Sequence, residues 1–252
     1  MTRRTNKRIW IFDFDGTLAP LVPERDKAEI HGESLKLLND LSATPGQRVA
    51  ILSSRMLDDL IPRVPVKGIF LGGGSGSEWL LPNGKRLAFC KLRKLREARG
   101  ALLPDLEKMA AGCGAELEDK KWSVALHTRR APPEGKQKLH HLIEVWPGAE
   151  RVGIFKGPEV IEVLFFPEVN KAFGVRTLRT ILKLPASFGA IVYSGDDEND
   201  ARAMECVTGM GGTAITIGDR PLVPSSMVVK DQTALAYAVR GIAAMDNGNN
   251  HV

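Results

Sequence analysis

Cysteine is scarce in this chain. Among its 252 residues only Cys90, Cys113 and Cys206 occur, an odd number, and none stands in a Cys-x-x-Cys or a cysteine/histidine spacing. Disulfide frameworks need paired cysteines, and zinc sites need ligands at short regular spacings. The sequence therefore argues against both, and its cysteine usage fits a reducing compartment.

A long hydrophobic run is also missing. Basic residues open the chain (Arg3, Arg4, Lys7 and Arg8), but the apolar stretch that follows them ends at Asp13. That stretch is far shorter than a signal peptide's apolar region or a membrane-spanning helix. We therefore expect a cytoplasmic protein with no membrane partner. Nothing in the sequence fixes the oligomeric state, and a monomer is the simplest expectation.

Aromatic side chains are absent from the most basic part of the chain. The net charge of +5 is compatible with an anionic ligand. The densest basic stretch, residues 91–99, alternates with leucines and contains no aromatic residue. Because nucleic-acid surfaces interleave basic and aromatic side chains, we interpret this stretch as the solvated face of an amphipathic helix and expect no nucleic-acid partner.

Short apolar segments alternate with helical patterns at both ends of the chain. The predicted elements are strands at 9–12, 48–52, 68–71, 191–193, 213–217 and 227–229, and helices at 33–43, 56–61, 171–182 and 232–244. Strands that alternate with helices in this way indicate an α/β core with a parallel sheet. The polar tail at 246–250 is expected to be disordered.

The middle of the chain has a different pattern. Leu81–Lys85 has the composition of a hairpin turn. After the basic helix, two predicted strands (about 115–129 and 151–166) flank a helix near 134–146. We therefore expect a small α+β domain at 84–167, inserted into a discontinuous core of 1–83 and 168–252.

Two aspartates end the first strand. Ile9-Trp10-Ile11-Phe12 leads directly to Asp13 and Asp15, whose side chains would share one face of a regular strand. Crowded carboxylates resist ionisation unless a cation lies between them, and Mg²⁺ is the hard cation that suits oxygen ligands. The alternative, a strand that ends in a plain Asp-Gly turn, needs only one acid and leaves Asp13 unexplained.

A second acidic group follows the strand at 191–193. Asp196, Asp197 and Asp200 lie with Glu198 within five residues. A turn that caps the next helix is the alternative, but a cap needs one acid only, so metal binding is the better explanation.

Two further residues have positions that suit an anion. Ser53 follows the strand at 48–52, where its hydroxyl could bind a phosphoryl oxygen or cap the next helix. Lys171 begins a predicted helix, where the positive end of the helix dipole disfavours a cation. An anion bound by both the lysine and the helix N-terminus would offset this unfavourable charge. An exposed lysine that happens to begin the helix is the alternative.

These segments resemble, in order, motifs I to IV of the haloacid dehalogenase (HAD) superfamily: Asp13–Thr17, Ser53, Lys171 and Gly195–Asp200. The resemblance implies a Rossmann-like HAD core with an inserted cap domain of the C2B type. It implies that Asp13 is the nucleophile that forms an aspartyl phosphate, and that Asp15 is the general acid and base. Ser53 and Lys171 would neutralise charge on the transferring group.

The resemblance also implies a metal site and a substrate. Mg²⁺ would be held by Asp13, the backbone carbonyl of Asp15 and Asp196, supported by Asp197 and Asp200. The segments Leu117–Arg129 and Gly157–Val163 resemble the cap of trehalose-6-phosphate phosphatases. This similarity implies that the substrate is trehalose 6-phosphate. It also implies the substrate-binding residues, which are Arg55, Glu118, Lys120 and Glu162.

The alternation of side chains along a strand divides the polar residues of the expected cap between two faces. A single regular strand would place Glu118 and Lys120 on one face with Trp122, and Ser123 and His127 on the other. Glu162 interrupts an apolar segment, and either a sugar hydroxyl or a salt bridge within the cap would satisfy it. His127 taken alone is expected to be structural.

The chain also departs from the family pattern. Ser54, Ser75, Ala172 and the segment 201–204 differ from the residues usual in the family. These departures leave open another sugar phosphatase, acting on sucrose phosphate or a glycosyl phosphoglycerate. A non-catalytic sensor of an anionic metabolite is a more distant alternative, since sensing needs no nucleophile.

Overall fold

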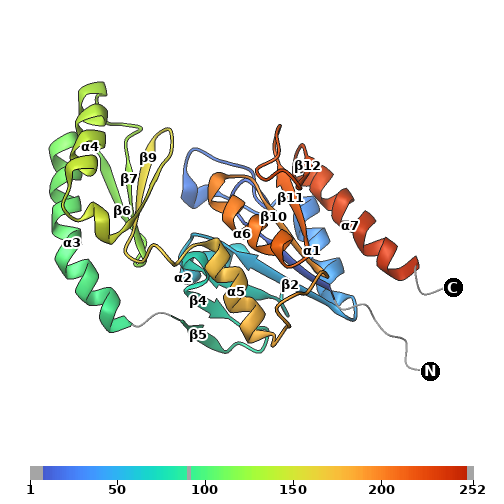
Figure 1. Ribbon diagram of the computed structural model, residues 1–252. Helices are drawn as coiled ribbons and strands as arrows, with labels where there is room; N and C mark the ends of the chain where they lie inside the picture. The colour runs from blue at the N-terminus through green and yellow to red at the C-terminus, as the bar shows by residue number, and fades with distance from the viewer. Residues whose placement is uncertain (1–7, 90–91, 249–252) are drawn as a thin grey trace. The chain divides into compact units, whose positions relative to one another are not determined.

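The computed structural model describes residues 8–89 and 92–248. Arg3, Arg4, Lys7, Cys90 and Lys91 lie outside this range. The chain forms two compact units, the first made of Met1–Leu87 and Asn170–Val252 and the second of Ala88–Val169 (Figure 1).

The first unit is built on an eight-stranded sheet with the strand order β12-β11-β10-β1-β2-β3-β4-β5. Its strands are β1 (Arg8–Phe12), β2 (Gln47–Leu52), β3 (Phe70–Gly73), β4 (Glu78–Leu80), β5 (Arg86–Ala88), β10 (Ile191–Gly195), β11 (Thr213–Ile217) and β12 (Met227–Val229). The strands from β12 to β3 are parallel, and β4 runs antiparallel to β3. Residues 9–12 therefore form a central strand, buried from both sides as their apolar character predicts.

Helices cover both faces of this sheet. They are α1 (Gly32–Ala43), α2 (Leu57–Arg63), α5 (Lys171–Ile181), α6 (Glu198–Gly209) and α7 (Gln232–Gly248). Trp10 and Phe12 pack with α1, α2 and α7, whereas Ile9 and Ile11 pack with α5 and α6. Alternate residues of β1 thus serve two separate cores, as the period of a strand requires.

The second unit has a four-stranded antiparallel sheet covered by two helices. The strand order is β6-β7-β9-β8. Its elements are α3 (Leu92–Cys113), β6 (Glu116–Asp119), β7 (Ser123–His127), α4 (Pro133–Val145), β8 (Gly153–Lys156) and β9 (Val160–Leu164). Apolar side chains from one face of the sheet, including Val124 and Leu126, pack against α3 and α4.

The predicted fold class is confirmed, and one part of the predicted secondary structure is wrong. The mixed α/β fold with a parallel sheet and a separate antiparallel sheet is present. The segments 115–129 and 151–166, each predicted as one strand, are β-hairpins instead. Helix α7 is assigned as far as Gly248, and 249–250 of the polar tail lie outside the described residues. Within the described ranges, no helix has the length and apolar character needed to cross a membrane.

Candidate active site

The strand ends of the first unit bring the predicted site residues to one edge of the sheet. Strand β1 lies between β2 and β10 and is parallel to both, so their carboxyl ends are neighbours. Asp13 follows β1, Ser53 follows β2 and Asp196 follows β10. Sites in open α/β sheets form at such an edge, and here the polar residues come from three adjacent strands.

Lys171 joins two of the carboxylates. Its Nζ lies 2.8 Å from Asp13 Oδ1 and 2.6 Å from Asp200 Oδ1, and all three side chains are buried. Burial alone would lower the pKa of Lys171, but the two carboxylates raise it well above its ordinary value. The lysine at the start of α5 is therefore a buried cation held by acids, as the prediction of a nearby anion required, and not an exposed one.

The Asp200 carboxylate accepts four hydrogen bonds. Oδ1 accepts hydrogen bonds from Lys171 Nζ and the Tyr193 hydroxyl, and Oδ2 accepts from the backbone N–H groups of Asp196 and Asp197. These bonds occupy both oxygens and fix the turn between β10 and α6. Tyr193 was missed from the sequence, although a tyrosine within a buried strand signals a need for a polar partner.

Asp197 is the N-cap of α6. Its carboxylate accepts from the backbone N–H of Asn199, and with Asp200 it forms a capping box. Burial would raise the pKa of Asp197, but Lys171 and the hydrogen bonds around the cap lower it. For this residue the structure shows the cap that the sequence offered as the alternative to a metal ligand.

Asp196 lies beside the glycine of the first loop. Gly16 has φ +80°, and a Cβ on it would come within 1.9 Å of Asp196 Oδ2, so only glycine fits there. Thr17 Oγ1 donates to Asp196 Oδ1 over 3.0 Å. Burial raises the pKa of Asp196 to about 7, and the charge of Asp200 acts in the same direction. A carboxyl group of this kind is poised to exchange a proton for a cation.

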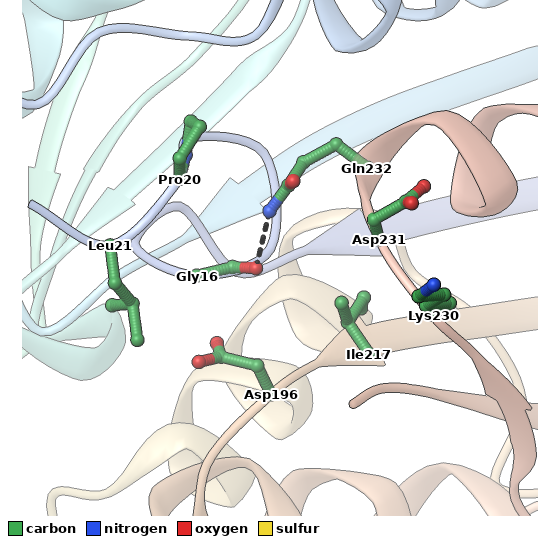
Figure 2. A pocket seen from close by; sticks show the side chains of 8 residues that line it. All are labelled: Gly16, Pro20, Leu21, Asp196, Ile217, Lys230, Asp231 and Gln232. Atoms are coloured by element: carbon green, nitrogen blue, oxygen red, sulfur yellow. Dashed lines mark hydrogen bonds between the residues drawn. The ribbon is translucent and has the colours of Figure 1, made fainter. Parts of the chain in front are cut away.

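A cavity of about 370 Å³ opens next to Asp196. Figure 2 shows the side chains around it, which come from the loop after β1, from the end of β11 and from the start of α7. Gln232 points across it, and its Nε2 donates to the Gly16 carbonyl over 2.7 Å. This bond joins residues 216 positions apart, and no local sequence signal could have revealed it.

Three carboxylates could hold a metal ion. Oxygens of Asp13, Asp196 and Asp200 lie within 4.8 Å of one another. Burial raises the pKa of Asp13 well above its ordinary value, although Lys171 acts to lower it. Both oxygens of Asp200 already accept two hydrogen bonds each. Asp13 and Asp196 are therefore the better metal ligands, and Asp200 supports the turn that carries Asp196. The donor set is all oxygen, which fits a hard divalent cation.

Asp15 points to a different partner. Both of its oxygens accept from Arg55, over 2.7 Å from Nε and 2.7 Å from Nη2. Arg55 also donates to Asp59 and to the backbone carbonyl of Arg25, and its side chain is 1 % exposed. In this structure the Asp15 side chain lies outside the cluster of three carboxylates, and Arg55 is a buried partner of Asp15.

Ser53 is buried at the end of β2. Its Oγ accepts from the backbone N–H of Arg55 over 3.1 Å. The N-cap of α2 is Met56, so Ser53 does not cap that helix. Its hydroxyl proton can therefore be donated to an anion at this edge of the sheet.

The second unit gathers the other predicted binding residues on one face of its sheet. Lys120 Nζ lies 3.2 Å from Glu162 Oε1 and 4.0 Å from Glu118 Oε2. The alternation argument was wrong, because the chain reverses at Lys121, which has φ +64°. In the resulting register Glu118 and Glu162 both lie opposite Ala125. Residues directly opposite each other share a face, and this face is the one opposite the apolar core.

Comparison with known proteins now decides the family. A trehalose-phosphatase model matches residues 11–217. The chain belongs to the trehalose-phosphatase family. Trehalose-phosphate phosphatase of Mycobacterium ulcerans (strain Agy99) is 33% identical over 226 residues, which cover 83% of this chain and 55% of that protein. The chain thus spans about half the length of the curated relatives it matches.

Solved structures show the same fold for this member of the trehalose-phosphatase family. A trehalose-6-phosphate phosphatase related protein has a TM-score of 0.74 at 20% identity, covering 96% of this chain and 99% of that one. The C-terminal domain of the Candida albicans trehalose-6-phosphate phosphatase has a TM-score of 0.75 at 18% identity, covering 96% and 93%. A haloacid dehalogenase-like hydrolase from Bacteroides thetaiotaomicron has a TM-score of 0.68 at 14% identity, covering 94% and 100%.

Proposed function

We propose that this chain is a phosphatase that hydrolyses trehalose 6-phosphate to trehalose and phosphate. The observation that carries the proposal is the arrangement of Asp13. It lies at the end of the central strand, against Lys171 and beside Asp196, in a chain that belongs to the trehalose-phosphatase family. Asp13 is the nucleophile, and its attack on phosphorus gives an aspartyl phosphate that water then hydrolyses.

Two residues neutralise charge on the group that moves. Lys171 Nζ is already within hydrogen-bond distance of the attacking carboxylate, so it also reaches an anion bound to Asp13. Ser53 supplies a hydroxyl donor from the neighbouring strand end. Donors fixed in advance at a buried site stabilise developing charge strongly, because they need no rearrangement during the reaction.

Asp15 is the general acid and base. It donates a proton to the leaving sugar oxygen and then takes one from the attacking water. The pair of hydrogen bonds from Arg55 holds its carboxylate in one orientation. Arg55 is therefore proposed to act as a positioning residue for Asp15.

Mg²⁺ is the proposed cofactor, held by Asp13, Asp196 and the Asp15 backbone carbonyl, with Asp200 and Asp197 fixing the turn that carries Asp196. The all-oxygen donor set and the raised pKa values of Asp13 and Asp196 support it. When bound, it supplies positive charge against the phosphoryl oxygens.

The second unit is proposed to be the cap domain that selects the sugar. Glu118, Lys120 and Glu162 form one polar group on the face of the sheet opposite the apolar core. Carboxylate and ammonium groups are the partners that sugar hydroxyls use. These three residues are therefore proposed to bind the glucose that lacks the phosphate.

A panel of phosphate esters tests the proposal. Phosphate release is measured with Mg²⁺ for trehalose 6-phosphate, sucrose phosphate, a glycosyl phosphoglycerate and p-nitrophenyl phosphate. We expect kcat/KM to be highest for trehalose 6-phosphate. Equal slow turnover of all four esters, or a clear preference for another sugar, would overturn the assignment of the substrate. No release from any ester would overturn the assignment as a phosphatase.

A further inference from the structure

Strand β7 of the second unit carries two polar side chains, Ser123 and His127, beside the proposed sugar-binding residues. Ser123 and His127 lie two residues to either side of Ala125, so all three point to the same face of the sheet. Ala125 is opposite Glu118 on one neighbouring strand and opposite Glu162 on the other. Ser123 and His127 are therefore the diagonal neighbours of these two glutamates, within reach of long side chains.

Each of the two side chains bonds one glutamate. Ser123 Oγ donates to Glu162 Oε1 over 2.8 Å, and Glu162 Oε1 also accepts a hydrogen bond from Lys120 Nζ. His127 Nε2 lies 3.0 Å from Glu118 Oε2. Because a carboxylate only accepts, Nε2 carries the proton in this bond. One strand thus orients a carboxylate on each side of it.

The core does not require these polar residues. Val124 and Leu126, which alternate with them, supply the apolar side of β7. Fixing a long side chain when a ligand binds costs roughly 0.5–1.5 kcal/mol. Hydrogen bonds made in advance remove that cost and leave the carboxylate aimed in one direction.

We infer that Ser123 and His127 are positioning residues for sugar recognition. They hold Glu162 and Glu118 so that both carboxylates accept hydrogen bonds from hydroxyls of the same sugar. The inference rests on the proposed function, because it needs a substrate whose phosphate-free sugar reaches these glutamates. It assigns specificity to residues that do not themselves contact the phosphate.

Steady-state kinetics of two variants tests the inference. Ser123→Ala and His127→Ala are each expected to raise KM for trehalose 6-phosphate by up to about tenfold, because the released glutamate side chain must then be fixed when the sugar binds. We expect kcat for this substrate, and kcat/KM for p-nitrophenyl phosphate, to stay near the wild-type values. His127→Gln, whose amide can donate to Glu118, is expected to recover most of the affinity.

Controls separate this inference from folding effects and from the substrate assignment. His141→Gln, on an exposed position of α4 in the same unit, is expected to change neither constant. Thermal melting of each variant checks that the unit is intact. If the wild type cleaves trehalose 6-phosphate and both alanine variants keep its KM, this inference alone is overturned. If the wild type does not cleave it, the proposed function fails first.

Discussion

Asp196→Asn should stabilise the metal-free protein while it weakens metal binding. Burial raises the pKa of Asp196 from 3.8 to about 7, so the folded state disfavours the ionised form of this group. The protein is therefore more stable when this carboxyl group is protonated, and that stability is lost as the pH rises through the pKa of the folded state. Asparagine keeps an oxygen for the bond from Thr17 and carries no charge.

The size of the effect follows from the pKa. Burial raises the pKa of Asp196 from 3.8 to about 7, and each pKa unit is worth about 1.36 kcal/mol. At pH 8 the ionised Asp196 therefore lowers the free energy of unfolding by about 4 kcal/mol. At pH 5 the unfolded-state carboxyl is mostly ionised and the folded one is still protonated, so the penalty is only about 2 kcal/mol. The variant should gain these amounts when metal is removed.

Urea unfolding of chelator-treated protein measures the gain at both pH values. Wild type and variant are compared at each pH, so that other groups that titrate cancel. Added Mg²⁺ should restore the stability of the wild type at pH 8 and have little effect on the variant. A variant that is no more stable than the wild type at pH 8, or whose gain is equal at the two pH values, would show that Asp196 is not held protonated in the folded state.

Two other substitutions test the loop after β1. Gly16→Ala places a Cβ against the carboxylate of Asp196 at a positive φ, so we expect at least a tenfold loss of Mn²⁺ affinity by spin resonance and a stability loss of about 1–2 kcal/mol. Unchanged Mn²⁺ affinity would show that the loop can move away. Arg55→Lys keeps the charge but loses the double hydrogen bond to Asp15, and we expect kcat to fall about 10²-fold. A wild-type kcat would show that Asp15 needs no such partner.

The sequence predicted the edge of the sheet where the site lies, because strand ends carry a local signal. An apolar run that stops at an acid, as at Asp13, is visible without any knowledge of the fold. Strand order then brings Ser53 and Asp196 next to it. Lys171 was predicted in the same way, from a charge that does not suit the start of a helix.

The sequence did not predict the partners that lie far along the chain. The bond from Gln232 to Gly16 and the pair of Arg55 with Asp15 depend on tertiary packing. The grouping of side chains on the two faces of the predicted strand at 115–129 was wrong for a local reason. Lys121 adopts a conformation that is unusual for a residue with a side chain, and the turn it makes reverses the alternation on which the argument relied.

The proposed reaction requires Asp13 to form a covalent bond to phosphorus. The protein is mixed with trehalose 6-phosphate and Mg²⁺, quenched in acid within one turnover, reduced with borohydride and mapped by mass spectrometry. The account predicts that reduction modifies position 13 alone, and that Asp13→Asn shows neither modification nor phosphate release. Turnover by the wild type without modification at Asp13, or phosphate release by Asp13→Asn, would contradict it.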